Sequence, residues 1–117
     1  MRVALLVSFV LGMSGSTLAQ AQVSPAANLG DRYVKACLKE DTEAFCRCEY
    51  QAVAQRVKDP KDLEFLTQLE EQTAGLPDDA LDEAMKKLPP DRLQWVITLS
   101  QEMAPTVEKC PDYRPRN

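Results

Sequence analysis

Residues 37–48 read CLKEDTEAFCRC, and this stretch holds three of the four cysteines of the chain; the fourth is Cys110. Cys46 and Cys48 are two residues apart, which on a helix turns their side chains about 200° from each other. A bond between these two would therefore need a distorted backbone. Each is expected to reach a different partner, one on the preceding segment and one at the far end of the chain.

The four cysteines predict a disulfide framework, because an even number of cysteines in a small exported chain is typical of cross-linked domains. We favour the pairing Cys37–Cys46 with Cys48–Cys110, and the exchanged pairing remains open. Two alternatives use the same Cys46-Arg47-Cys48 motif. It would serve as a thiol-redox pair activated by Arg47, or as a soft-metal site for copper(I) or zinc. With no histidine and no sheet pattern to support either, no cofactor or metal is expected.

The first 21 residues predict a signal peptide, with Arg2 as the positive end, an apolar run over 3–11, and Ala19-Gln20-Ala21 as the cleavage site. The apolar run is about half of the roughly 20 residues that cross a bilayer, so no membrane span is expected after cleavage. We therefore expect a signal peptide at 1–21, a disulfide-bonded helical domain at 22–110 and an irregular tail at 111–117. The expected location is periplasmic or secreted.

Composition excludes several classes of function. Without Arg2, 14 − 1 leaves 13 basic side chains against 18 acidic ones, a formal net charge of −5. This acidic balance argues against a nucleic-acid partner, which needs clustered Lys and Arg.

The chain has no histidine for Ser-His or Cys-His catalysis. Adjacent carboxylates such as Glu70-Glu71 are expected on solvated helix faces rather than across a catalytic cleft. We expect no enzyme.

Apolar residues recur at spacings of three and four, and no segment alternates as a strand would. The chain is therefore expected to be all-α, a small bundle of about five short helices stapled by two disulfides. Asp41 is the expected cap of the second helix, and Asp59 with Pro60 starts the third. The last helix is the most apolar and is expected to be central, with a kink or break at Pro105. The predicted helices cover 29–39, 42–58, 60–74, 78–88 and 91–104, after an extended start over 22–28.

Three side chains are candidates for an interaction. Glu49 and Arg56 fall within the apolar arc of the second helix, so we expect them to be partly buried. They would form a mutual or interhelical ion pair, or a polar contact inside a groove. Trp95 lies at the margin of the last helix's apolar arc, where it either closes the core or anchors a partner.

These observations predict an exported helical protein that acts by protein–protein interaction with an unidentified partner protein. A periplasmic thiol-redox or soft-metal carrier that uses Cys46 and Cys48 is an alternative. A periplasmic stress chaperone is a further alternative, by analogy of size and compartment. Because the chain is rich in carboxylates and has no histidine, the acid response of such a chaperone would fall below about pH 5.

Overall fold

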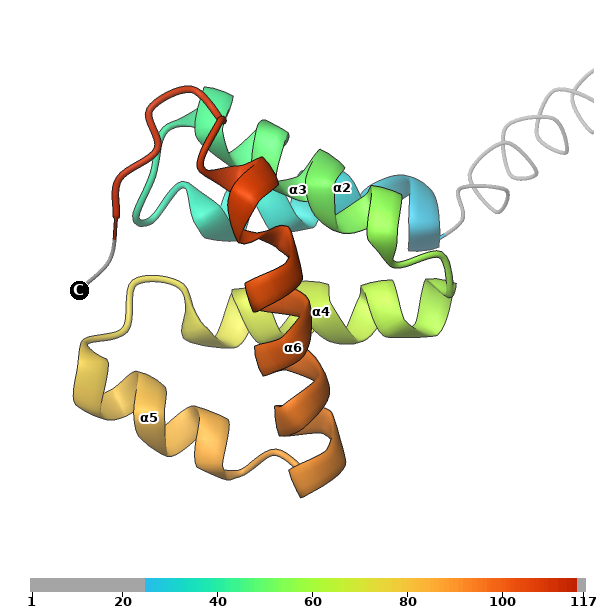
Figure 1. Cartoon of the computed structure of the whole chain (residues 1–117), viewed down its shortest axis with the longest axis vertical. Coiled ribbons are helices and arrows are strands. Elements are labelled where there is room, and N and C mark those ends of the chain that lie inside the picture. The colour runs from blue at the N-terminus through green and yellow to red at the C-terminus, as the bar shows by residue number, and fades with distance from the viewer. Residues whose placement is uncertain (1–24, 116–117) are drawn as a thin grey trace, which may run out of the picture.

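A computed structural model of the chain describes residues 25–115, which form five helices and no strand (Figure 1). The predicted all-helical class is confirmed. The predicted signal peptide at 1–21 lies outside the described residues, as do 22–24 and 116–117. The helices are α2 (Pro25–Cys37), α3 (Glu43–Arg56), α4 (Pro60–Thr73), α5 (Asp78–Lys86) and α6 (Pro90–Val107).

Helix α4 begins and ends where its local sequence predicts. The Asp59 carboxylate accepts a hydrogen bond from the backbone nitrogen of Lys61 at 2.9 Å, which satisfies an amide that has no partner inside the helix. After the helix ends, Gly75 takes the left-handed conformation with a φ of +81°. This conformation strains any residue with a Cβ, so glycine suits the position.

The predictions were wrong at the starts of α2 and α3. Thr42, not Asp41, caps α3, and its hydroxyl accepts from the backbone nitrogen of Phe45 at 3.3 Å. Both residue types can cap a helix, and Thr42 is the one that stands next to the first helical residue. The extended start is wrong for residues 25–28, because α2 already begins at Pro25. Proline fits there, since a first-turn amide has no helical partner to lose.

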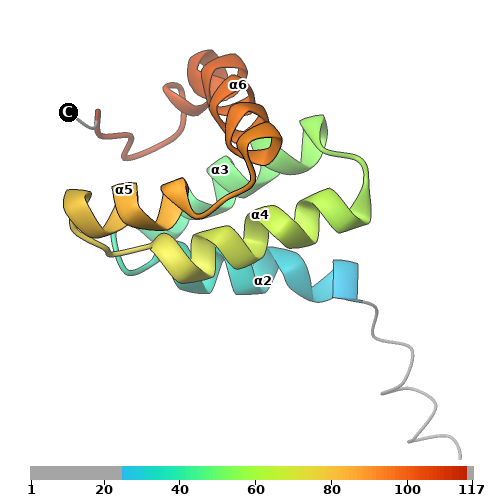
Figure 2. The same ribbon diagram turned by 90° about the horizontal axis from the view of Figure 1, so that it is seen from below.

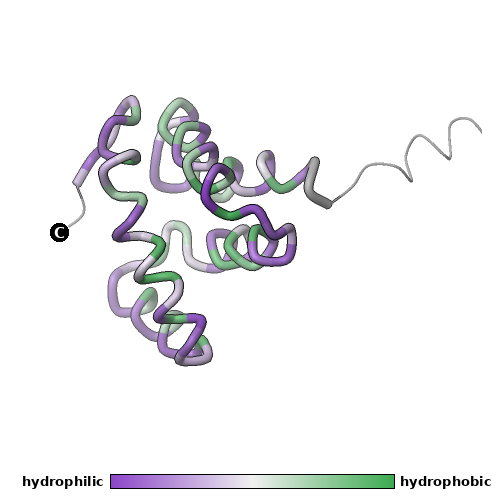
Figure 3. Tube along the Cα trace, turned by 45° about the vertical axis from the view of Figure 1, so that its right-hand side comes forward, coloured by the Kyte–Doolittle hydropathy of each residue, from purple (hydrophilic) through white to green (hydrophobic). Residues whose placement is uncertain are grey.

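Helix α2 packs against both α3 and α4 along one side of the bundle. Helix α6 crosses α3 on the side away from α2 (Figures 1 and 2). Apolar and polar stretches alternate along the helices, as expected where each has a buried and a solvated side (Figure 3). The buried residues of α2 are Leu29, Tyr33, Val34, Ala36 and Cys37.

The prediction that the last helix is central was wrong. Ile97 of α6 is 41% exposed, because the apolar arc of α6 is wider than its contact with α3. Nor does Pro105 divide this helix, which continues to Val107. The proline stands close to the end of α6, so the loss of its backbone donor disturbs only the final turn.

Two disulfides and one arginine tie the helices together. The favoured pairing is confirmed: Cys37–Cys46 ties the end of α2 to α3, and Cys48–Cys110 ties α3 to the chain after α6. The Arg32 guanidinium of α2 holds two carboxylates of α4, Glu64 at 2.9 Å and Glu71 at 2.8 Å. This arginine lowers the pKa of Glu71.

Mild reduction should open the Cys48–Cys110 bond first. Thiol–disulfide exchange needs access to a sulfur, and Cys37 and Cys46 are only 2% and 0% exposed, whereas Cys48 is half-buried. Limited reduction followed by alkylation and peptide mass mapping should place the first label on Cys48 and Cys110. Earlier labelling of Cys37 and Cys46 would contradict this order.

Candidate functional site

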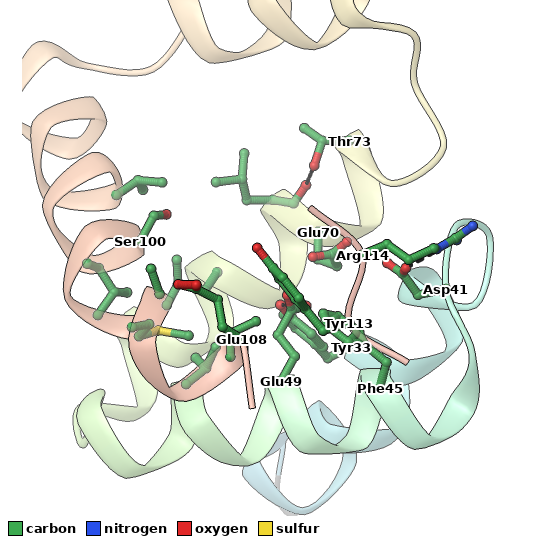
Figure 4. Close-up of a pocket in the computed structure, with 18 of the residues that line it drawn as sticks. Tyr33, Asp41, Phe45, Glu49, Glu70, Thr73, Ser100, Glu108, Tyr113 and Arg114 are labelled. Atoms are coloured by element: carbon green, nitrogen blue, oxygen red, sulfur yellow. Dashed lines mark hydrogen bonds and ion pairs between the residues drawn. The ribbon is translucent and has the colours of Figure 1, made fainter. Parts of the chain in front are cut away.

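A cavity of about 620 Å³ lies between α3, α4 and α6 (Figure 4). Each of these helices contributes apolar side chains to it. Exposed residues such as Ser100, Glu108 and Tyr113 also line the cavity, so it opens to solvent. We call it the interhelical groove. Its apolar walls include Phe45 and Val53 from α3, Leu66 and Leu69 from α4, and Leu99 and Met103 from α6.

Three polar side chains from three helices meet in the groove. Tyr33 of α2 is only 6% exposed, and its hydroxyl donates a hydrogen bond to Glu49 Oε1 of α3 at 2.7 Å. Glu70 of α4 also lies near this hydroxyl (Figure 4). Burial, followed by the negative charges of Glu49 and Glu70, raises the pKa of Tyr33 well above its usual value. We call Tyr33, Glu49 and Glu70 the polar floor.

Helical spacing brings both carboxylates into otherwise apolar stripes. Glu49 stands four residues after Phe45 and four before Val53, and all three line the groove. The sequence analysis singled out Glu49 for this reason, and the structure places it in the groove. Glu70 stands four residues after Leu66 and also lines the groove, whereas the sequence analysis expected it on a solvated face. The spacing from Leu66 was the signal that could have identified it.

The C-terminal tail forms one side of the groove, which the sequence analysis did not anticipate. Cys48–Cys110 holds the start of this irregular segment against α3. The rings of Tyr113 and Phe45 have centroids 6.3 Å apart. Arg114 donates to the backbone carbonyl of Glu40 at 2.7 Å.

Charged side chains from several elements line the groove. Among residues 25–115 these are the carboxylates of Asp41, Glu49, Glu70 and Glu108 and the guanidinium of Arg114. The Arg114 guanidinium lies 3.5 Å from Asp41 Oδ1, at the rim.

The other two candidate residues lie outside the groove. Arg56 forms an interhelical ion pair with Glu102 of α6, at 3.6 Å, and not with Glu49. Its side chain is 45% exposed, so the expectation that it would be partly buried was wrong. Trp95 is partly buried, packs against the core and faces Phe65, with ring centroids 6.2 Å apart. It closes the edge of the core, which was one of its two predicted roles.

Residues 25–115 contain neither a cluster of metal-binding side chains nor a membrane-spanning helix. All four cysteines are bonded in pairs. Within these residues no three side chains of the metal-binding types gather to hold an ion, and no helix has the length and apolarity to span a bilayer.

Replacing Tyr33 with phenylalanine should lower the free energy of unfolding by about 2 kcal/mol. The ring stays, but a hydrogen bond to a charged acceptor is lost, and such bonds contribute about 1.5–3 kcal/mol. Denaturant unfolding at neutral pH measures the difference. The control is Tyr50→Phe, which changes the neighbouring ring at 5.4 Å without touching the Glu49 bond and should cost roughly 0.5 kcal/mol or less. Equal losses for the two variants would contradict a stabilising role for the Tyr33–Glu49 bond.

The raised pKa of Tyr33 also predicts a pH dependence. The folded protein favours the neutral phenol, while in the unfolded chain tyrosine ionises near pH 10. This contribution to stability is complete below about pH 10 and is lost as the pH rises through the folded pKa. The stability advantage of the unsubstituted protein over Tyr33→Phe should therefore be constant at neutral pH and shrink as the pH rises above about 10. Lysines titrate in both proteins and cancel, so a constant difference would contradict the prediction.

No known protein-family model, curated protein or solved structure gives a significant match to this chain.

Proposed function

We propose that this protein is an exported, non-enzymatic binding protein that holds an apolar segment of a partner protein in the interhelical groove. The observation that carries the proposal is the groove itself, about 620 Å³, with apolar side chains from three helices and an opening to solvent. Concave apolar sites of this size are typical of binding sites, and exposed apolar surface is usually covered by a partner.

The covalent framework supports a preformed groove in an oxidising compartment. Cys37–Cys46 fixes α3 to α2, and Cys48–Cys110 fixes α3 to the tail, so one wall of the groove is cross-linked on both sides. Disulfides persist in secreted and periplasmic proteins, and the predicted signal peptide at 1–21 would deliver the chain there. A preformed site pays less ordering cost when a partner binds.

The chemistry of the groove favours binding over the alternatives. A soft-metal carrier needs free thiolates, and a redox pair made of Cys46 and Cys48 would join these two cysteines to each other, whereas each is bonded to a different cysteine. Catalysis by a histidine base is excluded by the composition. Aromatic and methionine side chains are enriched at protein interfaces, and the groove presents Phe45, Tyr113 and Met103.

The proposal is tested with peptides that bind the protein and with a variant whose groove is blocked. Random peptides displayed on phage are first selected for binding to the oxidised full-length protein. Ser100 is exposed and lines the groove, so Ser100→Trp obstructs the mouth without entering the core. We expect selected peptides to lose affinity for this variant by about tenfold or more. The matched control is Thr98→Trp, two residues earlier and on the opposite side of α6.

The outcomes separate the proposal from other uses of the same surface. Peptides that bind Ser100→Trp and the unsubstituted protein equally well would contradict it. A second copy of the chain in the groove would appear as a dimer in sedimentation, dissociated by Ser100→Trp, and would also overturn it.

A further inference from the structure

The C-terminal tail, residues 111–115, lies over part of the α3 wall of the interhelical groove. Each residue of the tail is exposed, yet Tyr113 lines the groove and its ring faces Phe45, with ring centroids 6.3 Å apart (Figure 4). This spacing is typical of favourable aromatic pairs. Phe45 is only 5% exposed, whereas Tyr113 is 36% exposed. Tyr113 therefore acts as a cover on Phe45, and another aromatic ring could take its place.

The tail is held by one covalent bond at its start and by hydrogen bonds at the surface. The disulfide of Cys110 fixes the start to α3. Further along, the Thr42 hydroxyl donates to the Asp112 carboxylate at 2.9 Å. Arg114 donates to the backbone carbonyl of Glu40 at 2.7 Å. Both hydrogen bonds are exposed, so water can replace them at little cost. The tail can therefore leave the groove while Cys110 stays in place.

The backbone of the tail is strained at Asp112. Its φ is +60°, in the left-handed region that is uncommon for residues with a Cβ. Aspartate enters this region more readily than most residues do, but the conformation is still less favourable than the right-handed one. Release of the tail relieves this strain, which offsets part of the attraction between Tyr113 and Phe45. A tail held in this way competes with a partner without excluding it.

The disulfide keeps Tyr113 near Phe45 even when the two rings are apart. Tyr113 stands three residues after Cys110, and a short flexible linker gives a local concentration on the order of millimolar. A weak contact between the rings is then enough to fill the place on Phe45 for much of the time. A partner displaces Tyr113 when its own ring is supported by further contacts along the groove.

We propose that the groove recognises an aromatic side chain of the partner at Phe45, and that Tyr113 fills this place until the partner displaces it. This inference rests on the proposed function and adds one feature of the occupant and one restraint on its binding. The partner's ring would pack on Phe45, and apolar residues on either side of it would lie along the walls formed by α4 and α6.

Peptides from the selection described above provide the first test. Each aromatic residue of a binding peptide is replaced by alanine, and affinity for the oxidised full-length protein is measured by titration calorimetry. One replacement should weaken binding by about tenfold or more, as the loss of an aromatic anchor does at other interfaces. This measurement uses the unsubstituted protein, so it does not depend on whether a variant folds.

The matching change in the protein is Tyr113→Ala, which removes the competing ring at an exposed position. It should strengthen binding of the aromatic peptide by about threefold or more, because the affinity is no longer reduced by the fraction of molecules whose site the tail fills. The peptide that carries alanine instead should respond little, since it does not use the place on Phe45.

A second variant loosens the tail without changing its ring. Arg114→Ala removes the hydrogen bond to Glu40 and the ion pair with Asp41, and it should also strengthen binding of the aromatic peptide. Tyr113→Phe keeps the ring and should therefore keep the competition. Lys109→Ala is the control, since it changes an exposed position next to Cys110 and outside the groove. It should leave both affinities nearly unchanged.

The results distinguish this inference from the proposed function. Peptides that lose binding to Ser100→Trp but contain no essential aromatic residue would overturn the aromatic site and leave the groove as a binding site. Weaker binding of the aromatic peptide to Tyr113→Ala would also overturn the inference, because the ring would then be a wall that the partner contacts. Equal effects of Tyr113→Ala and Lys109→Ala would do the same. Peptides indifferent to Ser100→Trp would overturn both proposals together.

Discussion

The burial of Tyr33 between three helices is the constraint on which the rest of the structure depends. A phenol hydroxyl cannot be buried cheaply without an acceptor, so α3 must turn a polar side chain inward at Glu49. The close approach of α3 also favours a small residue on α2, because a Cβ at Gly30 would lie 3.1 Å from Cε2 of Tyr50, closer than an ordinary van der Waals contact. Cys37–Cys46 then fixes the two helices together. The carboxylate in the groove is thus a consequence of how the core packs.

The parts of the fold that depend on local chemistry could be predicted from the sequence. The two-residue spacing of Cys46 and Cys48 predicts that they bond to different cysteines, as they do. Asp59 followed by Pro60 predicts the start of α4, where the Asp59 side chain caps the helix. The arrangement of the helices could not be predicted in the same way. Apolar periodicity shows which face of a helix is buried but not which neighbour covers it. That is why α6, with its wide apolar arc, was expected to be central, whereas in the structure it packs mainly against α3 and leaves Ile97 exposed.

The candidate site was only half visible in the sequence, for a related reason. Glu49 stood out because Phe45 and Val53 flank it at helical spacing. Glu70 did not, because its neighbour Glu71 made the pair look like a solvated face. In the structure the two side chains point to different places: Glu71 forms an ion pair with Arg32 of α2, and Glu70 lines the groove. The tail has no periodicity to predict where it lies, so its place at the groove depends on contacts formed only after folding.

The walls of the groove differ in how firmly they are held in place, and this difference would affect how the groove selects a partner. The α3 wall is cross-linked by both disulfides, and the polar floor is buried at Tyr33. On another side of the groove, the lining residue Met85 comes from α5, a helix that buries none of its residues. The flexible side chain of methionine can also adapt its shape to what it contacts. Walls that adapt discriminate weakly by shape, since apolar side chains of different size can repack there. Any selection by shape in such a groove would therefore come from the cross-linked α3 wall rather than from the α5 side.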